Sequence, residues 1–127
     1  MHSEIPLDDR IGRTVYAGGS LWRYLYDRGS RRFTMQRTVT NIPLDLALEL
    51  IESGEVLWTP PARFARLGAA DSLESVRHRI ALLEAFRRSP GCAGSSDWMM
   101  RARVDAQLVV LRKWLHRNAL SSGEEGA

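Results

Sequence analysis

Residues 18–40 read GGSLWRYLYDRGSRRFTMQRTVT. In this stretch two runs of alternating apolar and polar residues flank residues 27–30, Asp-Arg-Gly-Ser, a composition typical of a turn. Alternation with a period of two is the pattern of a β-strand that buries one face. The segment therefore predicts an antiparallel β-hairpin with strands over residues 21–26 and 31–40.

The register of this hairpin follows from the apolar residues of the two runs. These are Trp22, Tyr24 and Tyr26 in the first run, and Phe33, Met35 and Val39 in the second. The two sets lie on one face of the sheet only if the loop contains an even number of residues, two or four. We expect Tyr24 opposite Phe33 and Trp22 opposite Met35.

The aromatic residues of the hairpin allow two interpretations. They are either the inner face of a sheet covered by helices or a surface on which unpaired bases stack, as in single-strand binders. An isolated hairpin is marginally stable unless its apolar face is covered. We therefore expect these residues to be core, with the side chains of Tyr24 and Phe33 under helices.

The charge of the chain is concentrated near the hairpin. Seventeen arginines stand against one lysine, and seven of the arginines lie within residues 10–41, where Asp27 is the only acid. A GC-rich genome substitutes arginine for lysine throughout its proteins, so the ratio in part reflects codon bias and the clustering is the informative feature. Guanidinium groups bind phosphates and carboxylates alike. We expect five hairpin arginines to contact an anionic partner: Arg23, Arg28, Arg31, Arg32 and Arg37.

Three helices are predicted after the hairpin. The first covers residues 44–53 and ends at Gly54, which suits the position after a helix. The second begins at Asp71, which forms a capping box with Glu74, and the third follows a loop over residues 89–96. The second and third helices carry apolar stripes at helical spacing, which predict an antiparallel helical hairpin: Leu73, Val76, Ile80 and Leu83, and Met100, Val104, Leu108 and Leu111.

The length and pattern of the chain predict one α+β domain over residues 1–127. In this domain a small antiparallel sheet, formed by the N-terminal hairpin, packs in two layers against about three helices. Ser95 or Ser96 is expected to cap the last helix. Residues 1–12 are expected to be an irregular lead-in, and residues 121–127 a flexible tail.

Sites of known chemistry are not evident in the sequence. The histidines, His2, His78 and His116, are far apart, and the spacing of metal ligands is missing. Cys92 is the only cysteine and lies in a predicted loop, where an incidental thiol is the simpler interpretation. We expect no catalytic residue, no metal and no cofactor. Without a signal segment or a long apolar run, a cytoplasmic location is expected, with no membrane contact.

The expected function is therefore non-catalytic binding of an anionic partner through the arginine-rich hairpin. Nucleic acid is the first partner predicted, held through its phosphates with little reading of bases. The alternative is a protein-binding inhibitor or accessory factor, for example of a host-defence or mobile-element system, that engages an acidic protein surface.

Overall fold

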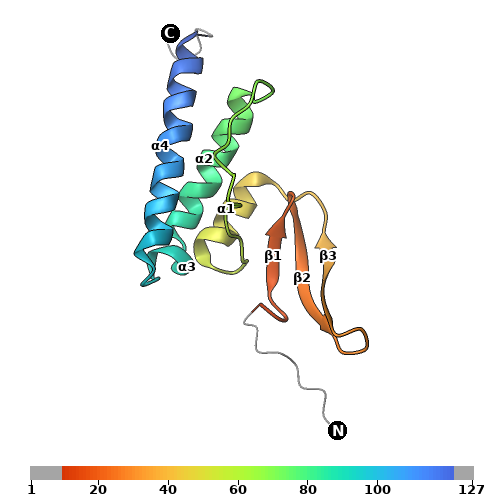
Figure 1. Cartoon of the computed structure of the whole chain (residues 1–127). Helices are drawn as coiled ribbons and strands as arrows, with labels where there is room; N and C mark the ends of the chain where they lie inside the picture. Colours follow the sequence, from red (N-terminus) through yellow and green to blue (C-terminus); the bar gives the residue numbers. More distant parts are fainter. Residues whose placement is uncertain (1–9, 122–127) are drawn as a thin grey trace. The chain divides into compact units, whose positions relative to one another are not determined.

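The computed structural model describes residues 10–121 (Figure 1). These residues form a three-stranded antiparallel sheet followed by four helices, which confirms the α+β class and the small N-terminal sheet. The chain divides into two compact units, residues 1–58 and 59–127, each described below by itself. Residues 1–9 of the predicted lead-in and 122–127 of the predicted tail lie outside the described residues.

The sheet of the first unit has the strand order β1 (Thr14–Ala17), β2 (Ser20–Asp27), β3 (Arg32–Val39), and both neighbouring pairs are antiparallel. Gly18 and Gly19 join β1 to β2 as a two-residue turn, with φ values of 58° and 81°. Two successive positive φ values are what a tight hairpin turn demands, and glycine adopts them without steric penalty.

The register of β2 and β3 confirms the even loop but corrects the partners. Asp27 pairs with Arg32, so the loop holds residues 28–31 rather than residues 27–30 or the two residues 28–29, and every predicted pair shifts by two. Tyr24 lies opposite Met35, and Tyr26 lies opposite Phe33. The turn is held by the Asp27 carboxylate and by a positive φ of 57° at Arg31. A shift of two residues leaves each side chain on its predicted face.

A β-bulge further along the same strand pair changes the membership of one face. The register slips between Leu21 and Trp22, so that Trp22 lies opposite Arg37 while Leu21 lies opposite Val39. The prediction that Val39 shares a face with Phe33 is therefore wrong. Bulges of this kind insert an extra residue and re-aim the side chains beyond it. Arg37, which lies before the bulge, shares the aromatic side with Phe33 and Met35 by alternation, and only Val39 leaves it.

Helix α1 (Leu44–Ser53) completes the first unit at the predicted bounds. Gly54 ends it in the left-handed conformation, at φ 84°, and its amide donates to the carbonyl of Ile51. The chain then returns to β1, where Leu57 forms one parallel bridge through hydrogen bonds with Thr14 and Tyr16, both 2.9 Å long.

The second unit is helical: α2 (Leu73–Arg88), the single turn α3 (Pro90–Ala93) and α4 (Trp98–Ser121). The helices α2 and α4 lie side by side and antiparallel, as predicted (Figure 1). The predicted stripes supply most of the buried side chains of both helices, including Val76, Ile80, Leu83, Val104, Leu108 and Leu111. The expected loop over residues 89–96 contains α3, which buries Cys92.

Both helix caps differ from the prediction. Ser72 caps α2, because its hydroxyl accepts from the Ser75 amide at 3.0 Å. Asp71 is not available for this role, since its carboxylate pairs with Arg79 and accepts from the Gly68 amide. At α4 the side chain of Asp97, rather than a serine, accepts from the backbone amide of Met100 at 3.1 Å.

Candidate nucleic-acid interface

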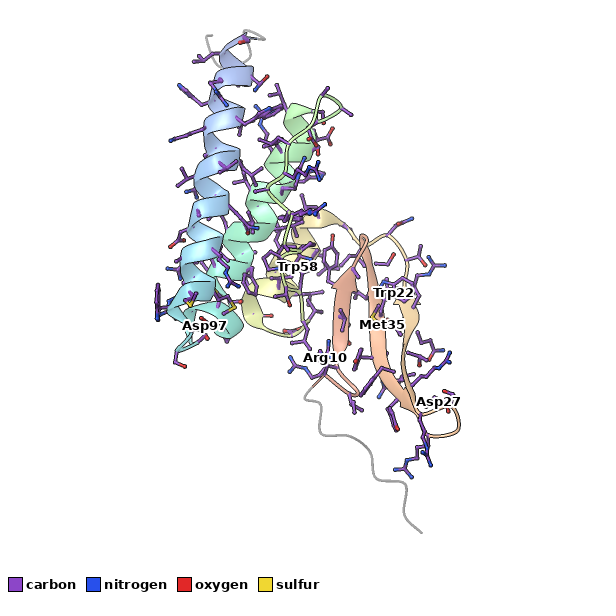
Figure 2. All side chains as sticks on the ribbon, in the orientation of Figure 1. Arg10, Trp22, Asp27, Met35, Trp58 and Asp97 are labelled. Atoms are coloured by element: carbon purple, nitrogen blue, oxygen red, sulfur yellow. The ribbon has the colours of Figure 1, made fainter. Side chains whose placement is uncertain are left out.

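The five arginines predicted to bind an anion are all exposed, but the hairpin distributes them over both faces and the turn. The pairing of the strands places Arg23 and Arg32 on one face, opposite Gln36 and Asp27. Arg28 and Arg31 belong to the turn beyond Asp27, which marks the end of the hairpin in Figure 2. The remaining one, Arg37, lies on the other face, opposite Trp22.

None of these five guanidinium groups has an acidic partner within residues 10–121. Arg37 instead lies over the ring of Trp22. Asp27 is the only acid in the hairpin, and its carboxylate accepts instead from the Ser30 hydroxyl at 2.8 Å and the Gly29 amide at 3.0 Å. The Ser30 hydroxyl and then the Gly29 amide lower the pKa of Asp27, so the carboxylate stays ionised within its own turn.

Arginines of the second unit are used differently. Arg79 donates to the carbonyl oxygens of Phe64 and Arg66, at 3.1 and 2.9 Å, and pairs with Asp71. Two further ion pairs join α2 to α4, Arg87 with Asp105 at 3.0 Å and Arg112 with Glu84 at 3.4 Å. These side chains hold structural elements together, whereas those of the hairpin are left available to a ligand.

The aromatic side of the hairpin is not the covered core that the sequence predicted. Phe33 is 42% exposed and Met35 is 46% exposed, while Trp22, Tyr24 and Tyr26 are half-buried. Within the second unit, the apolar stripes of α2 and α4 face one another, as predicted. The aromatic side of the sheet is therefore partly exposed to solvent.

Three of these rings, Tyr24, Tyr26 and Phe33, contact one another. The centroids of Tyr24 and Phe33 are 5.3 Å apart with ring planes inclined by 18°, and those of Tyr26 and Phe33 are 5.1 Å apart at 53°. The guanidinium carbon of Arg37 lies 5.5 Å from the Trp22 ring centre, within the range of a cation–π contact. We call the set Trp22, Tyr24, Tyr26, Phe33, Met35 and Arg37 the aromatic face.

A second cation lies on this face that sequence reasoning did not select. The guanidinium carbon of Arg10 lies 4.6 Å from the ring centre of Tyr24. The chain reaches this point because the Gly12 amide donates to the Tyr24 carbonyl at 2.7 Å, which continues the pairing of β1 with β2. Arg10 is the first arginine of the basic cluster, but its place over a ring depends on this tertiary contact.

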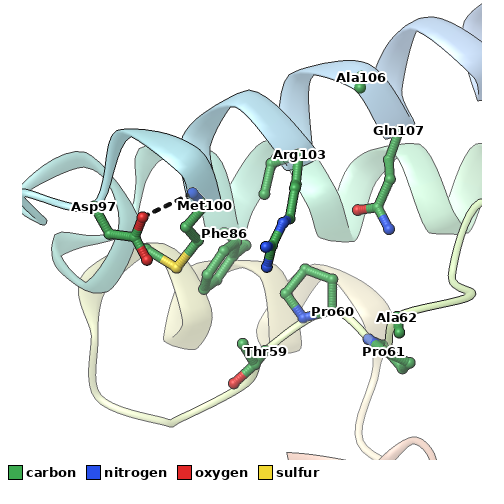
Figure 3. A pocket seen from close by; sticks show the side chains of 11 residues that line it. Thr59, Pro60, Pro61, Ala62, Phe86, Asp97, Met100, Arg103, Ala106 and Gln107 are labelled. Carbon is green, nitrogen blue, oxygen red and sulfur yellow. Dashed lines mark hydrogen bonds between the residues drawn. The ribbon is translucent and has the colours of Figure 1, made fainter.

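Other places in the described chain offer less for chemistry. A cavity of about 630 Å³ in the second unit lies among Phe86, Met100, Arg103 and the Thr59–Ala62 segment (Figure 3). Its carboxylate, Asp97, already accepts from the Met100 amide as a helix cap. Burial raises the pKa of the Cys92 thiol, which disfavours the reactive thiolate.

Within residues 10–121, histidine, cysteine and acidic side chains nowhere gather in threes as metal ligands would. Nor does any helix of that range combine the length and the apolar character needed to cross a bilayer. Comparison of the chain with protein-family models, with curated proteins and with solved structures finds no match.

Proposed function

We propose that the β2–β3 hairpin is a non-catalytic nucleic-acid-binding element. Its arginines contact backbone phosphates and contribute little to reading the bases. The contact residues are those predicted from the sequence: Arg23, Arg28, Arg31, Arg32 and Arg37. We also propose that the protein is cytoplasmic, which cell fractionation would test.

The observation that carries this proposal is the uncompensated charge of the hairpin. Residues 20–39 contain five arginines against Asp27, a net charge of +4, and the Asp27 carboxylate is occupied by its own turn. Like charges held on one small element repel each other, and a polyanion relieves that repulsion while it releases its bound counterions. The planar guanidinium fork also matches the geometry of phosphate oxygens.

The experiment is a salt titration with fluorescein-labelled oligothymidylate and a labelled mixed-sequence duplex, measured by fluorescence anisotropy. The logarithm of the association constant should fall linearly with the logarithm of salt concentration. The slope is about −0.9 for each phosphate neutralised on a duplex and about −0.7 on a single strand. Four or five contacts therefore give a slope of roughly −3 to −4.

Matched variants separate the hairpin from general basicity. Arg23→Ala should make the slope shallower by about 0.7 to 0.9, whatever the sequence of the nucleic acid. Arg63→Ala removes the same charge from an exposed position of the second unit and should leave the slope as it is. Equal effects of the two substitutions would contradict a specific role for the hairpin.

The alternative partner is an acidic protein surface. If neither oligonucleotide binds at low salt, the nucleic-acid proposal fails and the inhibitor or accessory-factor hypothesis becomes the leading one. A complex captured from the native host should then resist nuclease and should be lost on Arg23→Ala.

A further inference from the structure

We infer that the nucleic acid bound by this hairpin is single-stranded, and that unpaired bases stack on the aromatic face. This inference rests on the proposed function and adds to it the class of ligand. The arginines by themselves do not distinguish a duplex from a single strand, because both present phosphates. The aromatic face supplies the distinction, because it offers surfaces that only unpaired bases match.

The first argument is the exposure of the rings. Phe33 and Met35 are 42% and 46% exposed, on a face where alternate residues of β2 contribute Trp22, Tyr24 and Tyr26. Large aromatic side chains normally contribute to stability through burial, so a face on which Phe33 is exposed and three other rings are only half-buried marks a surface for contact. The stacked pair of Tyr24 and Phe33 shows that planar groups already associate face to face at this site.

The second argument is spacing. Successive residues on one face of a strand are about 7 Å apart, roughly twice the 3.4 Å rise between stacked nucleotides of one strand. Bases that contact successive side chains of this face along β2 must therefore be separated from one another. A single strand can extend in this way, whereas a duplex keeps its base faces stacked and presents only edges and phosphates.

The third argument is charge on the ring faces. The guanidinium groups of Arg37 and Arg10 lie over the rings of Trp22 and Tyr24, at 5.5 and 4.6 Å. A ligand on this face meets the rings and the exposed guanidinium group of Arg37, so it needs a planar apolar part and a negative charge. Bases joined by phosphates meet both conditions, and guanidinium planes also stack on bases. An apolar helix of a partner protein would meet only the first.

The test compares the labelled oligothymidylate with the duplex for the whole protein and two variants. Phe33→Leu keeps an apolar side chain on the aromatic face but removes the ring. Thr34→Ala, at the neighbouring exposed position on the opposite face, is its matched control. Phe33→Leu should weaken binding of oligothymidylate about 5- to 150-fold, the range for loss of one stacked base, with little change for the duplex. Thr34→Ala should change neither.

The salt slope separates failure of this inference from failure of the proposed function. Phe33→Leu removes no phosphate contact, so its slope should equal that of the wild type, whereas Arg23→Ala should make the slope shallower. If Phe33→Leu leaves oligothymidylate affinity unchanged, or if the wild type binds the duplex at least as tightly, stacking is refuted while phosphate binding stands. If neither ligand binds at low salt, both proposals fall.

A measurement on the wild-type protein covers the case in which Phe33→Leu does not fold. An oligonucleotide that carries bromodeoxyuridine is cross-linked by ultraviolet light, and the adducts are mapped by mass spectrometry. We expect adducts on Trp22, Tyr26 or Phe33. Adducts confined to residues outside β2 and β3 would overturn the inference.

Discussion

Leu111→Ala provides the sharpest test of how the second unit is held together. Leu111 has no exposed surface and belongs to the stripe of α4 in a unit where α4 packs against α2. The substitution removes roughly three methyl or methylene groups at about 0.8 kcal/mol each, which amounts to about 2.4 kcal/mol on transfer from water. The cavity left behind raises the expected loss of unfolding free energy to about 2.7–5 kcal/mol.

The adjacent residue provides the control. Val110 is 47% exposed, one position along the same helix, and Val110→Ala should change the unfolding free energy by no more than about 0.5 kcal/mol. Urea unfolding followed by circular dichroism at the helical band measures both variants, with the midpoint and slope fitted together. Losses of equal size for the two variants would refute the facing of α4 and the packing argument built on it.

Three further predictions concern titratable groups. Because the pKa of Asp27 is lowered in the folded protein, its turn contributes stability at pH values above the ordinary carboxyl pKa. This contribution is lost as pH falls through the pKa of the folded state. An NMR titration that follows the Asp27 and Ser30 signals should show the loss. The Cys92 thiol should react slowly with Ellman's reagent in the native protein and rapidly in urea, because burial raises its pKa. Arg79→Ala should reduce the unfolding free energy in urea by about 1–3 kcal/mol, since it leaves Asp71 and two carbonyl oxygens without their donor.

Much of the local structure was predictable from the sequence because its causes are local. Helix α1 begins after Pro43 and ends at Gly54 as expected, since proline suits the start of a helix and glycine the left-handed residue after it. The faces of the hairpin were predictable for a similar reason: alternation decides which side chains share a face, whatever the length of an even loop. The stripes of α2 and α4 also identified most of their buried residues.

The position of the hairpin loop and the residue that caps α2 depended on which neighbouring groups bond to each other, which the local sequence pattern does not show. Loops over residues 27–30 and over residues 28–31 give the same faces, and the bonds that Asp27 makes to Gly29 and Ser30 favour the second. The capping role passed from Asp71 to Ser72 because Arg79, eight residues along the chain, pairs with Asp71.

The sequence by itself determined which hairpin residues are aromatic, which are basic and on which side of the sheet most of them lie. Only the tertiary structure decided that Phe33 is exposed, that a bulge turns Val39 away from the aromatic face, and that Arg10 lies over Tyr24. Periodicity indicates that a face is apolar but not what covers it. Coverage depends on where the other apolar stripes of the chain are used, and those of α2 and α4 are buried against each other.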